Sequence, residues 1–176
     1  MIFSQTAIPG AFLISLNRSE DERGFFARTF CRSEFEEHGL NPDCAQCSIS
    51  FNKQRGTLRG MHFQKPPFEE TKVVRCTMGT LFDVIIDLRP DSPTFKHWLS
   101  FELSAENRSM LYIPRGLAHG FLTQEDNTEV FYQMSVQYVP ESTAGIRWND
   151  SAFGIQWPEP PRIISIKDQE YTDFIS

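Results

Sequence analysis

Two histidines and a cluster of basic residues are the side chains of this sequence best suited to chemistry. His62 lies in a stretch, residues 51–75, that holds six Lys or Arg residues against Glu69 and Glu70, a balance of +4. The whole chain carries −6. A local positive region on an acidic protein favours a small anionic ligand over a nucleic-acid polymer, which binds a broad basic surface. The solvated rim of a sheet would account for the charge pattern equally well.

The second histidine, His119, ends the sequence Pro-Arg-Gly-Leu-Ala-His. Pro-x-Gly-x-x-His resembles the second motif of the cupin jelly rolls, whose histidines often bind a metal. The first cupin motif would need His-x-His near His62, and this chain reads His62-Phe-Gln64 instead. The sequence therefore predicts no metal site, and it predicts acid–base work for the two histidines. His38 and His97 lie in polar segments and are expected to be solvated.

Short strands are expected to position these side chains. Aromatic residues make up 13% of the chain, and 11 Pro and 10 Gly are spread along it, which favours many turns and few long helices. The pattern predicts a mainly β fold, an antiparallel sandwich or barrel. Residues 73–78 and 81–88 read as a hairpin, and in the latter Asp83 and Asp87 alternate with apolar residues, as in a half-buried strand. One short surface helix, residues 33–39, is expected from a Ser33–Glu36 capping box and Gly39.

Two strand faces bear directly on chemistry. In residues 129–138 the apolar face includes Tyr132, so this side chain is expected to point into the barrel. Strict alternation would place Arg59 and His62 on opposite faces of their strand. A pocket that uses both residues would need a β-bulge at Gly60 between them, and we predict one there.

The remaining features set limits on the class of protein. The N-terminus has no basic region and no long apolar run, and no segment approaches the roughly 20 apolar residues that span a membrane. A cytoplasmic protein of one domain, residues 1–176, is expected. The four cysteines include a lone Cys44-Ala-Gln-Cys47 without the second ligand pair of a structural zinc site, so free thiols are expected.

A series of motifs runs along nearly the whole chain. The sharpest is Gly56-Thr-Leu-Arg-Gly-Met-His-Phe-Gln64. The others are Asp87-Leu-Arg with Ser92-Pro-Thr, Leu103-Ser-Ala-Glu-Asn107, Ile113-Pro-Arg-Gly-Leu-Ala-His-Gly-Phe121, Ile146-Arg-Trp-Asn-Asp150 and Ser165-Ile-Lys-Asp168. In this order and spacing the chain resembles the dTDP-4-dehydrorhamnose 3,5-epimerase family. The resemblance implies a homodimeric cupin-type jelly roll that epimerises nucleotide-linked 4-keto-6-deoxyhexoses without metal or cofactor.

The resemblance also implies roles for single residues. His62 would be the base, Asp168 would orient it, Tyr132 would be the acid on the opposite face, and Lys72 would lie near the enolate. These types suit the reaction, because a proton beside a ketone needs a base poised near neutral pH and a positive group for the enolate oxygen. The implied substrate-binding residues are Arg23, Phe26, Arg28, Gln46, Ser48, Arg59, His119, Tyr138 and Lys167. Among them, Arg23 resembles a residue lent across the dimer to the nucleotide.

Three departures from the family lie on the nucleotide side. Arg28 stands where the family usually has Glu, Cys47 and Ser48 replace an acidic residue and Asn, and Thr143 replaces a Glu. The family glutamate resembles an acceptor for a thymine ring N–H, whereas arginine only donates. This leads to the hypothesis that the base is cytosine or guanine, and it leaves open whether C3 alone or both C3 and C5 are inverted.

Other functions fit parts of the pattern. A non-catalytic cupin that binds sugar nucleotides would keep the basic residues but would not need His62, Tyr132 and Asp168 together. A metal-dependent cupin oxygenase or isomerase, or a 3,4-keto isomerase on the same scaffold, would use similar residues differently.

Overall fold

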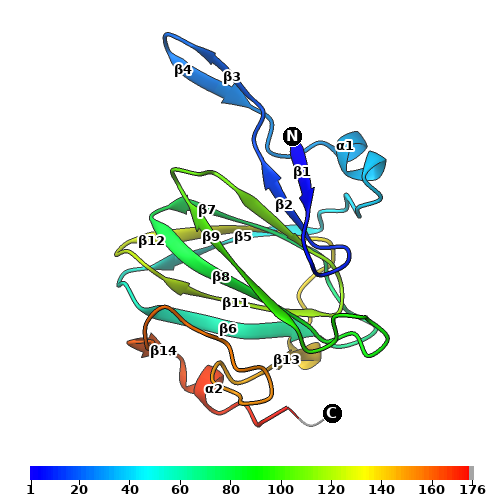
Figure 1. The fold of residues 1–176 in the computed structure, drawn as a ribbon, viewed down its shortest axis with the longest axis vertical. Helices are drawn as coiled ribbons and strands as arrows, with labels where there is room; N and C mark the ends of the chain where they lie inside the picture. Colours follow the sequence, from blue (N-terminus) through cyan, green and yellow to red (C-terminus); the bar gives the residue numbers. More distant parts are fainter. Residues whose placement is uncertain (175–176) are drawn as a thin grey trace.

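The computed structural model describes residues 1–174. Strands with alternating apolar residues form two sheets that face each other (Figure 1). The first sheet has the order β1 (Ile2–Gln5), β2 (Phe12–Ser15), β10 (Met110–Ile113), β7 (Lys72–Met78), β12 (Thr128–Met134), β5 (Gln46–Asn52). The second has the order β13 (Thr143–Gly145), β6 (Thr57–Gln64), β11 (Leu117–Thr123), β8 (Thr80–Asp87), β9 (Trp98–Ser104), and β14 (Ile163–Ile164) pairs with β6.

The remaining elements are short. A separate hairpin of β3 (Arg18–Asp21) and β4 (Gly24–Ala27) projects away from the two sheets (Figure 1). The helices are α1 (Arg32–Glu37), the 3-10 turn η1 (Pro140–Ser142) and α2 (Ile166–Gln169). All strand pairs are antiparallel except β14 with β6, so the mainly β, antiparallel jelly-roll prediction is confirmed. That the chain is one domain over residues 1–176 stays a prediction, and its last two residues lie outside the described part.

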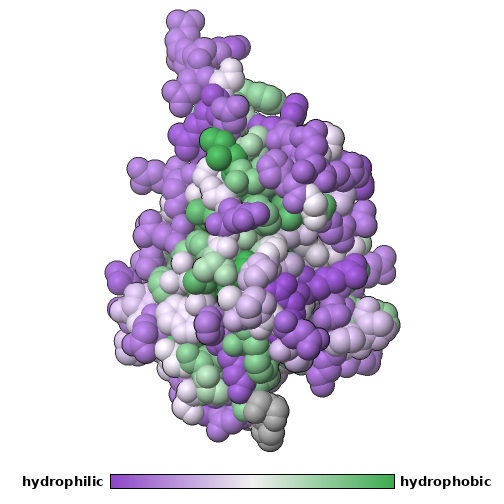
Figure 2. All heavy atoms as spheres, turned by 45° about the vertical axis from the view of Figure 1, so that its right-hand side comes forward, coloured by the Kyte–Doolittle hydropathy of each residue, from purple (hydrophilic) through white to green (hydrophobic). Residues whose placement is uncertain are grey.

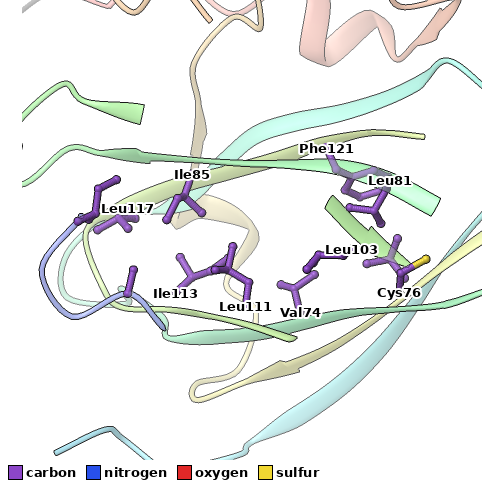
Figure 3. Close-up of a cluster of buried hydrophobic side chains, with 12 residues drawn as sticks. Val74, Cys76, Leu81, Ile85, Leu103, Leu111, Ile113, Leu117 and Phe121 are labelled. Carbon is purple, nitrogen blue, oxygen red and sulfur yellow. The ribbon is translucent and has the colours of Figure 1, made fainter. Parts of the chain in front are cut away.

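One apolar cluster joins the two sheets (Figure 3). Val74 and Cys76 of β7 point at Leu81 of β8 and Phe121 of β11, and all four side chains are almost fully buried. Burial of each large apolar side chain contributes about 1.5–3 kcal/mol. This cluster fixes the spacing of the sheets, and with it the walls of any cavity between them.

The predicted hairpin of residues 73–78 and 81–88 is wrong. β7 pairs with β10 and β12 in the first sheet, whereas β8 pairs with β11 and β9 in the second. The turn at Gly79 therefore passes the chain from one sheet to the other. β7 and β8 each turn an apolar face to the same core. The two strands therefore pack against each other through side chains across the sandwich and are not hydrogen-bonded to each other.

The expected half-buried character of β8 is also wrong. Asp83 and Asp87 are both fully buried, and they lie in phase with Leu81 and Ile85 of the inter-sheet core. The opposite face of β8 is covered as well, because the C-terminal segment packs on it with residues that include Ile146, Phe153 and Trp157. Because both faces of β8 are covered, its two carboxylates are removed from water and need hydrogen-bonding partners within the protein.

The predicted helix is confirmed as α1, but its predicted start is wrong. Its N-cap is Cys31, with no side-chain capping hydrogen bond, so the Ser33 capping box is wrong. Glu36 instead lies 3.6 Å from Arg32 in an exposed ion pair. Gly39 is confirmed as the residue that ends the helix, since it has a φ of 70° and donates its N–H to the Glu36 carbonyl.

No helix among residues 1–174 is long and apolar enough to cross a membrane.

Asp87 provides a test of how this fold pairs its buried carboxylates. Burial would raise its pKa, but hydrogen bonds from Arg89, Ser92 and Thr94 at 2.6–2.8 Å hold the pKa well below its usual range. A depressed carboxyl pKa gives stability above the unfolded value of about 4 that is lost as pH falls. Asp87→Asn should therefore lower the free energy of unfolding by about 1–3 kcal/mol at pH 7.

Urea denaturation at several pH values between 7 and 2.5 measures this difference. The gap between the wild type and Asp87→Asn should shrink below pH 4, because the carboxyl of the unfolded wild type then gains a proton while the folded one is still ionised. A gap independent of pH would contradict the electrostatic origin of this stability.

Candidate active site

A cavity of about 600 Å³ opens between the sheets beside the C-terminal segment. Side chains from β5, β6 and β12 line it, together with residues of β14 and α2. All four predicted catalytic residues and five predicted substrate-binding residues are among those that line it: His62, Lys72, Tyr132, Asp168, Ser48, Arg59, His119, Tyr138 and Lys167. The structure thus brings together side chains that lie up to 120 positions apart.

The bulge predicted at Gly60 is confirmed. Between Arg59 and His62, β6 advances three residues while β11 advances two, from Phe121 to His119. The extra residue turns the side chains of Arg59 and His62 to the same side of β6, and both line the cavity. Gly60 has a φ of 137°, and a Cβ there would lie 2.5 Å from the Gly120 Cα, so glycine is required on both counts.

His62 is paired with a buried carboxylate. Its Nε2 lies 2.7 Å from Asp168 Oδ1, and the backbone N–H of Gly60 donates to Asp168 Oδ2 at 3.3 Å. Asp168 is only 4% exposed, whereas the His62 side chain is 38% exposed toward the cavity. When Nε2 donates to the carboxylate, Nδ1 is left free to accept a proton.

The carboxylate is held in its charged form. Burial would raise the pKa of Asp168, but the hydrogen bond and charge of His62 and the backbone N–H of Gly60 outweigh it and lower the pKa. Ser165 supports the geometry, because its Oγ accepts the Asp168 N–H at 3.1 Å and caps α2. The pair therefore keeps a negative charge beside the imidazole at neutral pH.

A second histidine–aspartate pair lies deeper in the cavity wall. His119 Nε2 is 2.8 Å from Asp83 Oδ2, and both residues are buried. The His119 ring meets the Tyr132 ring edge-on at 6.1 Å between centroids. Burial, followed by the charge of Asp83, raises the pKa of Tyr132, and Arg59 opposes the shift in part. The Tyr132 hydroxyl therefore keeps its proton at neutral pH.

Two basic residues of the cavity have partners. Lys72 is buried, and its Nζ lies 3.0 Å from Glu70 Oε1. The Arg59 Nε donates to Asn52 Oδ1 at 2.7 Å, and this bond orients the guanidinium. Both cations are thus fixed before any anion arrives.

Four predicted binding residues do not line the cavity of their own chain. Arg23 and Phe26 lie on the projecting hairpin, where the Arg23 side chain pairs with Asp21 and Phe26 is 80% exposed. Arg28 is exposed and donates to Glu34 Oε1 at 2.8 Å. Gln46 contacts a lining residue instead, because its Oε1 accepts the backbone N–H of Tyr138 at 2.9 Å.

Comparison with known proteins decides the family. The family model described as dTDP-4-dehydrorhamnose 3,5-epimerase matches residues 5–175. The chain belongs to this family. It is therefore an enzyme of the isomerase class.

Individual relatives agree with this assignment. The dTDP-4-dehydrorhamnose 3,5-epimerase of Salmonella typhimurium strain LT2 is 43% identical over 159 residues, which cover 90% of this chain and 86% of that one. The enzyme of that name from Elizabethkingia anophelis NUHP1 superposes with a TM-score of 0.96 at 38% identity, covering 99% and 96% of the two chains. The one from Bacillus anthracis strain Ames, solved with TDP and PPi bound, gives a TM-score of 0.95 at 37% identity, covering 98% and 99%.

Some residues that shape this epimerase cavity were missed from the sequence. Asp83, Glu70 and Asn52 hold His119, Lys72 and Arg59 respectively. Asp83 had a readable signal, because Leu81 and Ile85 flank it on its own face of the strand and the opposite face is entirely apolar. A carboxylate at such a position must be buried and therefore paired. Glu70 and Asn52 lie in polar sequence and gave no such signal.

Within residues 1–174, no cluster of three or more His, Cys, Asp or Glu side chains has the arrangement of a metal site. The four cysteines carry free thiols, and Cys44 Sγ lies 3.5 Å from Cys47 Sγ.

Asp168→Asn tests the charge of the first pair. The amide keeps the size of the side chain but removes the negative charge that faces His62 Nε2, so kcat should fall by about 10²-fold or more. The change should leave the folded structure intact in circular dichroism. Asp91→Asn, at an exposed aspartate in a turn, is the matched control and should retain wild-type kcat. Wild-type turnover by Asp168→Asn would contradict the role of the carboxylate.

Proposed function

We propose that this protein inverts one or both carbons beside the ketone of a nucleotide-linked 4-keto-6-deoxyhexose. The observation that carries the proposal is one cavity that holds a carboxylate-paired histidine, a buried lysine and a protonated tyrosine. Membership of the epimerase family supports the same reaction.

His62 acts as the base in this proposal. Its Nδ1 removes the proton beside the ketone, and the electron pair of the C–H bond moves into an enolate. Asp168 favours the imidazolium that forms and fixes the ring orientation. Without such a partner, a histidine removes a proton from carbon only slowly, because a C–H group beside a ketone is a very weak acid.

Lys72 and Tyr132 complete the reaction. The Lys72 ammonium lies in the cavity as preorganised positive charge for the enolate oxygen. Tyr132 then donates its hydroxyl proton to the carbon from the opposite face, which inverts the centre. The raised pKa of Tyr132 keeps this proton on the oxygen until the enolate has formed.

The remaining lining residues bind the substrate. Arg59 and Lys167 place two cations at the cavity, where they attract the phosphates of a sugar nucleotide. His119 and Tyr138 line the cavity and, in this proposal, contact the sugar. Ser48 and Gln46, both on β5, are assigned to the nucleotide.

Solvent deuterium exchange separates the two catalytic roles. In deuterated water the wild type should place deuterium at C3, C5 or both, as NMR of the sugar would show. Removing the base in His62→Ala should abolish exchange. Tyr132→Phe should keep measurable exchange but lose inversion, since a base can return a proton to the face from which it took it.

Other results would exclude this mechanism. Wild-type inversion by Tyr132→Phe would remove Tyr132 from the acid role. Absence of exchange in the wild type with every nucleotide tested would favour a non-catalytic binding protein. A stoichiometric metal found by elemental analysis of the same active sample would favour a metal-dependent enzyme.

The nucleobase is a separate proposal. Arg28 in place of the family glutamate led to the hypothesis of cytosine or guanine. In the structure, Arg28 donates a hydrogen bond to Glu34 Oε1. The other carboxylate oxygen of Glu34 accepts a hydrogen bond from the amino group of Met1 at 2.6 Å. A carboxylate acceptor therefore lies beside the guanidinium. With relatives named for dTDP sugars and one solved with TDP, we propose thymine as the base.

A panel of dTDP-, CDP- and GDP-linked 4-keto-6-deoxyglucose tests this choice. We expect kcat/KM to be at least about tenfold higher for the dTDP substrate, since about 1.4 kcal/mol of differential binding gives that ratio. Glu34→Gln should reduce the preference. A higher kcat/KM for the CDP or GDP substrate would instead support the hypothesis drawn from Arg28 alone.

We also propose a homodimer in which the projecting hairpin reaches the second copy. The hairpin carries Phe26, one of the most exposed large apolar side chains among residues 1–174. β5 is an edge strand of the first sheet, and its outward residues Ile49 and Phe51 are exposed by 62% and 45%. Figure 2 shows hydrophobic side chains at the surface of the body below the hairpin. An exposed apolar edge strand is a ready site for a partner.

The molar mass in solution tests the dimer. Light scattering should give twice 20.3 kDa for the wild type. Phe51→Lys places a charge on the apolar edge and should shift the mass toward the monomer. Phe68→Lys changes a similarly exposed phenylalanine, 42% exposed, in the loop after β6 and should leave the dimer intact. A monomeric wild type would contradict the proposal. The cytoplasmic location stays a prediction.

A further inference from the structure

The helix that carries Asp168 is poorly anchored by its own contacts. α2 has four residues, and Asp168 is its one buried residue. Its neighbour Ile166 is 72% exposed. Yet Asp168 must remain within hydrogen-bond distance of His62. The segments on either side of α2 therefore have to fix its position.

Before α2, a short strand provides one anchor. Ile163 and Ile164 of β14 pair in parallel with Thr57 and Leu58 of β6, the strand that also carries His62. This pairing fixes where α2 begins. It does not fix the rotation of the helix, because Asp168 lies four residues beyond the last paired position.

After α2, Tyr171 provides the second anchor. Its ring lies directly over Gly145 of β13, where a Cβ would collide with Cε2 and Cζ of the ring. Gly145 is the residue of β13 that pairs with His62. The Tyr171 ring also meets the His62 ring edge-on, with 6.2 Å between centroids. The absence of a side chain at Gly145 thus makes room for an aromatic ring beside the imidazole.

The chain beyond Tyr171 is fixed to the same segment. Asp173 forms an ion pair with Arg147, and the Phe174 N–H donates to Asp150 Oδ2 at 2.6 Å. These contacts hold the tail along residues 145–150. Tyr171 is therefore at the centre of a clamp that presses α2 toward β6.

The hydroxyl of Tyr171 takes no part in this contact. Its Oη is buried and has no hydrogen-bond partner among residues 1–174. Burial and the nearby negative charge of Asp168 raise the pKa of the phenol, so the group stays neutral. The contact to His62 and Gly145 is made by the ring.

We infer that Tyr171 is a positioning residue, whose ring on Gly145 keeps Asp168 and His62 in register. The inference rests on the proposed function of His62 as the base. A positioning role predicts a loss of kcat with little change of KM, because Tyr171 is not among the residues that line the cavity proposed to bind the substrate. A displacement of about 1 Å in a catalytic group can lower a rate by about 10²-fold.

Four variants test the inference. Tyr171→Ala removes the ring, and Gly145→Ala displaces it by steric overlap. Tyr171→Phe keeps the ring and should rescue the function that alanine loses. Gly145→Ala/Tyr171→Ala removes the overlap, so it should be no worse than Tyr171→Ala alone. Phe82→Leu, which removes a ring packed against Trp157 on the outer face of β8, is the matched control and should retain wild-type kcat.

The readouts are kcat, KM and the proton NMR signal of the His62 ring N–H bound to Asp168, assigned with His62→Ala. We expect Tyr171→Ala and Gly145→Ala to lose kcat by at least about tenfold, with KM changed less than about threefold, and to lose the N–H signal. Tyr171→Phe should retain the signal and at least half of kcat.

Two results would overturn the inference: an intact N–H signal with wild-type kcat in both Tyr171→Ala and Gly145→Ala, or an additive double variant. If Tyr171→Ala does not fold, Gly145→Ala and the double variant give the same decision. A wild type that shows the N–H signal but exchanges no deuterium would refute the proposed function, while the signal would still test the clamp.

Discussion

The structure depends on one carboxylate that bonds to both sides of a bulge. Asp168 accepts the Gly60 N–H with one oxygen and faces His62 Nε2 with the other. The bulge turns Arg59 and His62 to the same side of β6, and the carboxylate holds that irregular backbone in place. A buried charge is costly unless it is fully bonded, so this arrangement requires both partners. The shape of the strand and the chemistry of the histidine thus share one cause.

Similar polar pairs recur around this centre. His119 with Asp83, Lys72 with Glu70 and Arg59 with Asn52 each combine a cavity group with a second polar group behind it. Rigid positioning of charge before substrate binds is what stabilises an enolate best, because nothing has to reorganise during the reaction. The apolar core between the sheets supplies the rigidity, and β14 and α2 of the C-terminal segment contribute to the cavity lining.

Much of this site was predictable from local sequence. The motif around His62 and the alternation around Tyr132 gave the right faces, and the conflict between Arg59 and His62 correctly required a bulge at Gly60. The pairing of β7 with β10 and β12 was not predictable, because a tight turn at Gly79 looks the same whether it joins two strands of one sheet or crosses between sheets. The face of β8 that carries Val84 and Ile86 is buried by a C-terminal cover more than 50 residues away, whereas Asp83 and Asp87 lie on the face toward the core between the sheets. Local alternation carries no information about what lies on the second face.

The proposed mechanism requires a base and an acid on opposite faces of one carbon. A structure of the protein with a bound nucleotide-linked 4-keto sugar, or a stable analogue of it, tests this requirement most directly. A carbon beside the ketone should lie within reach of His62 Nδ1 on one face and of the Tyr132 hydroxyl on the other, with Lys72 Nζ at the ketone oxygen. A sugar ring that places His62 and Tyr132 on the same face, or out of reach of both, would contradict it.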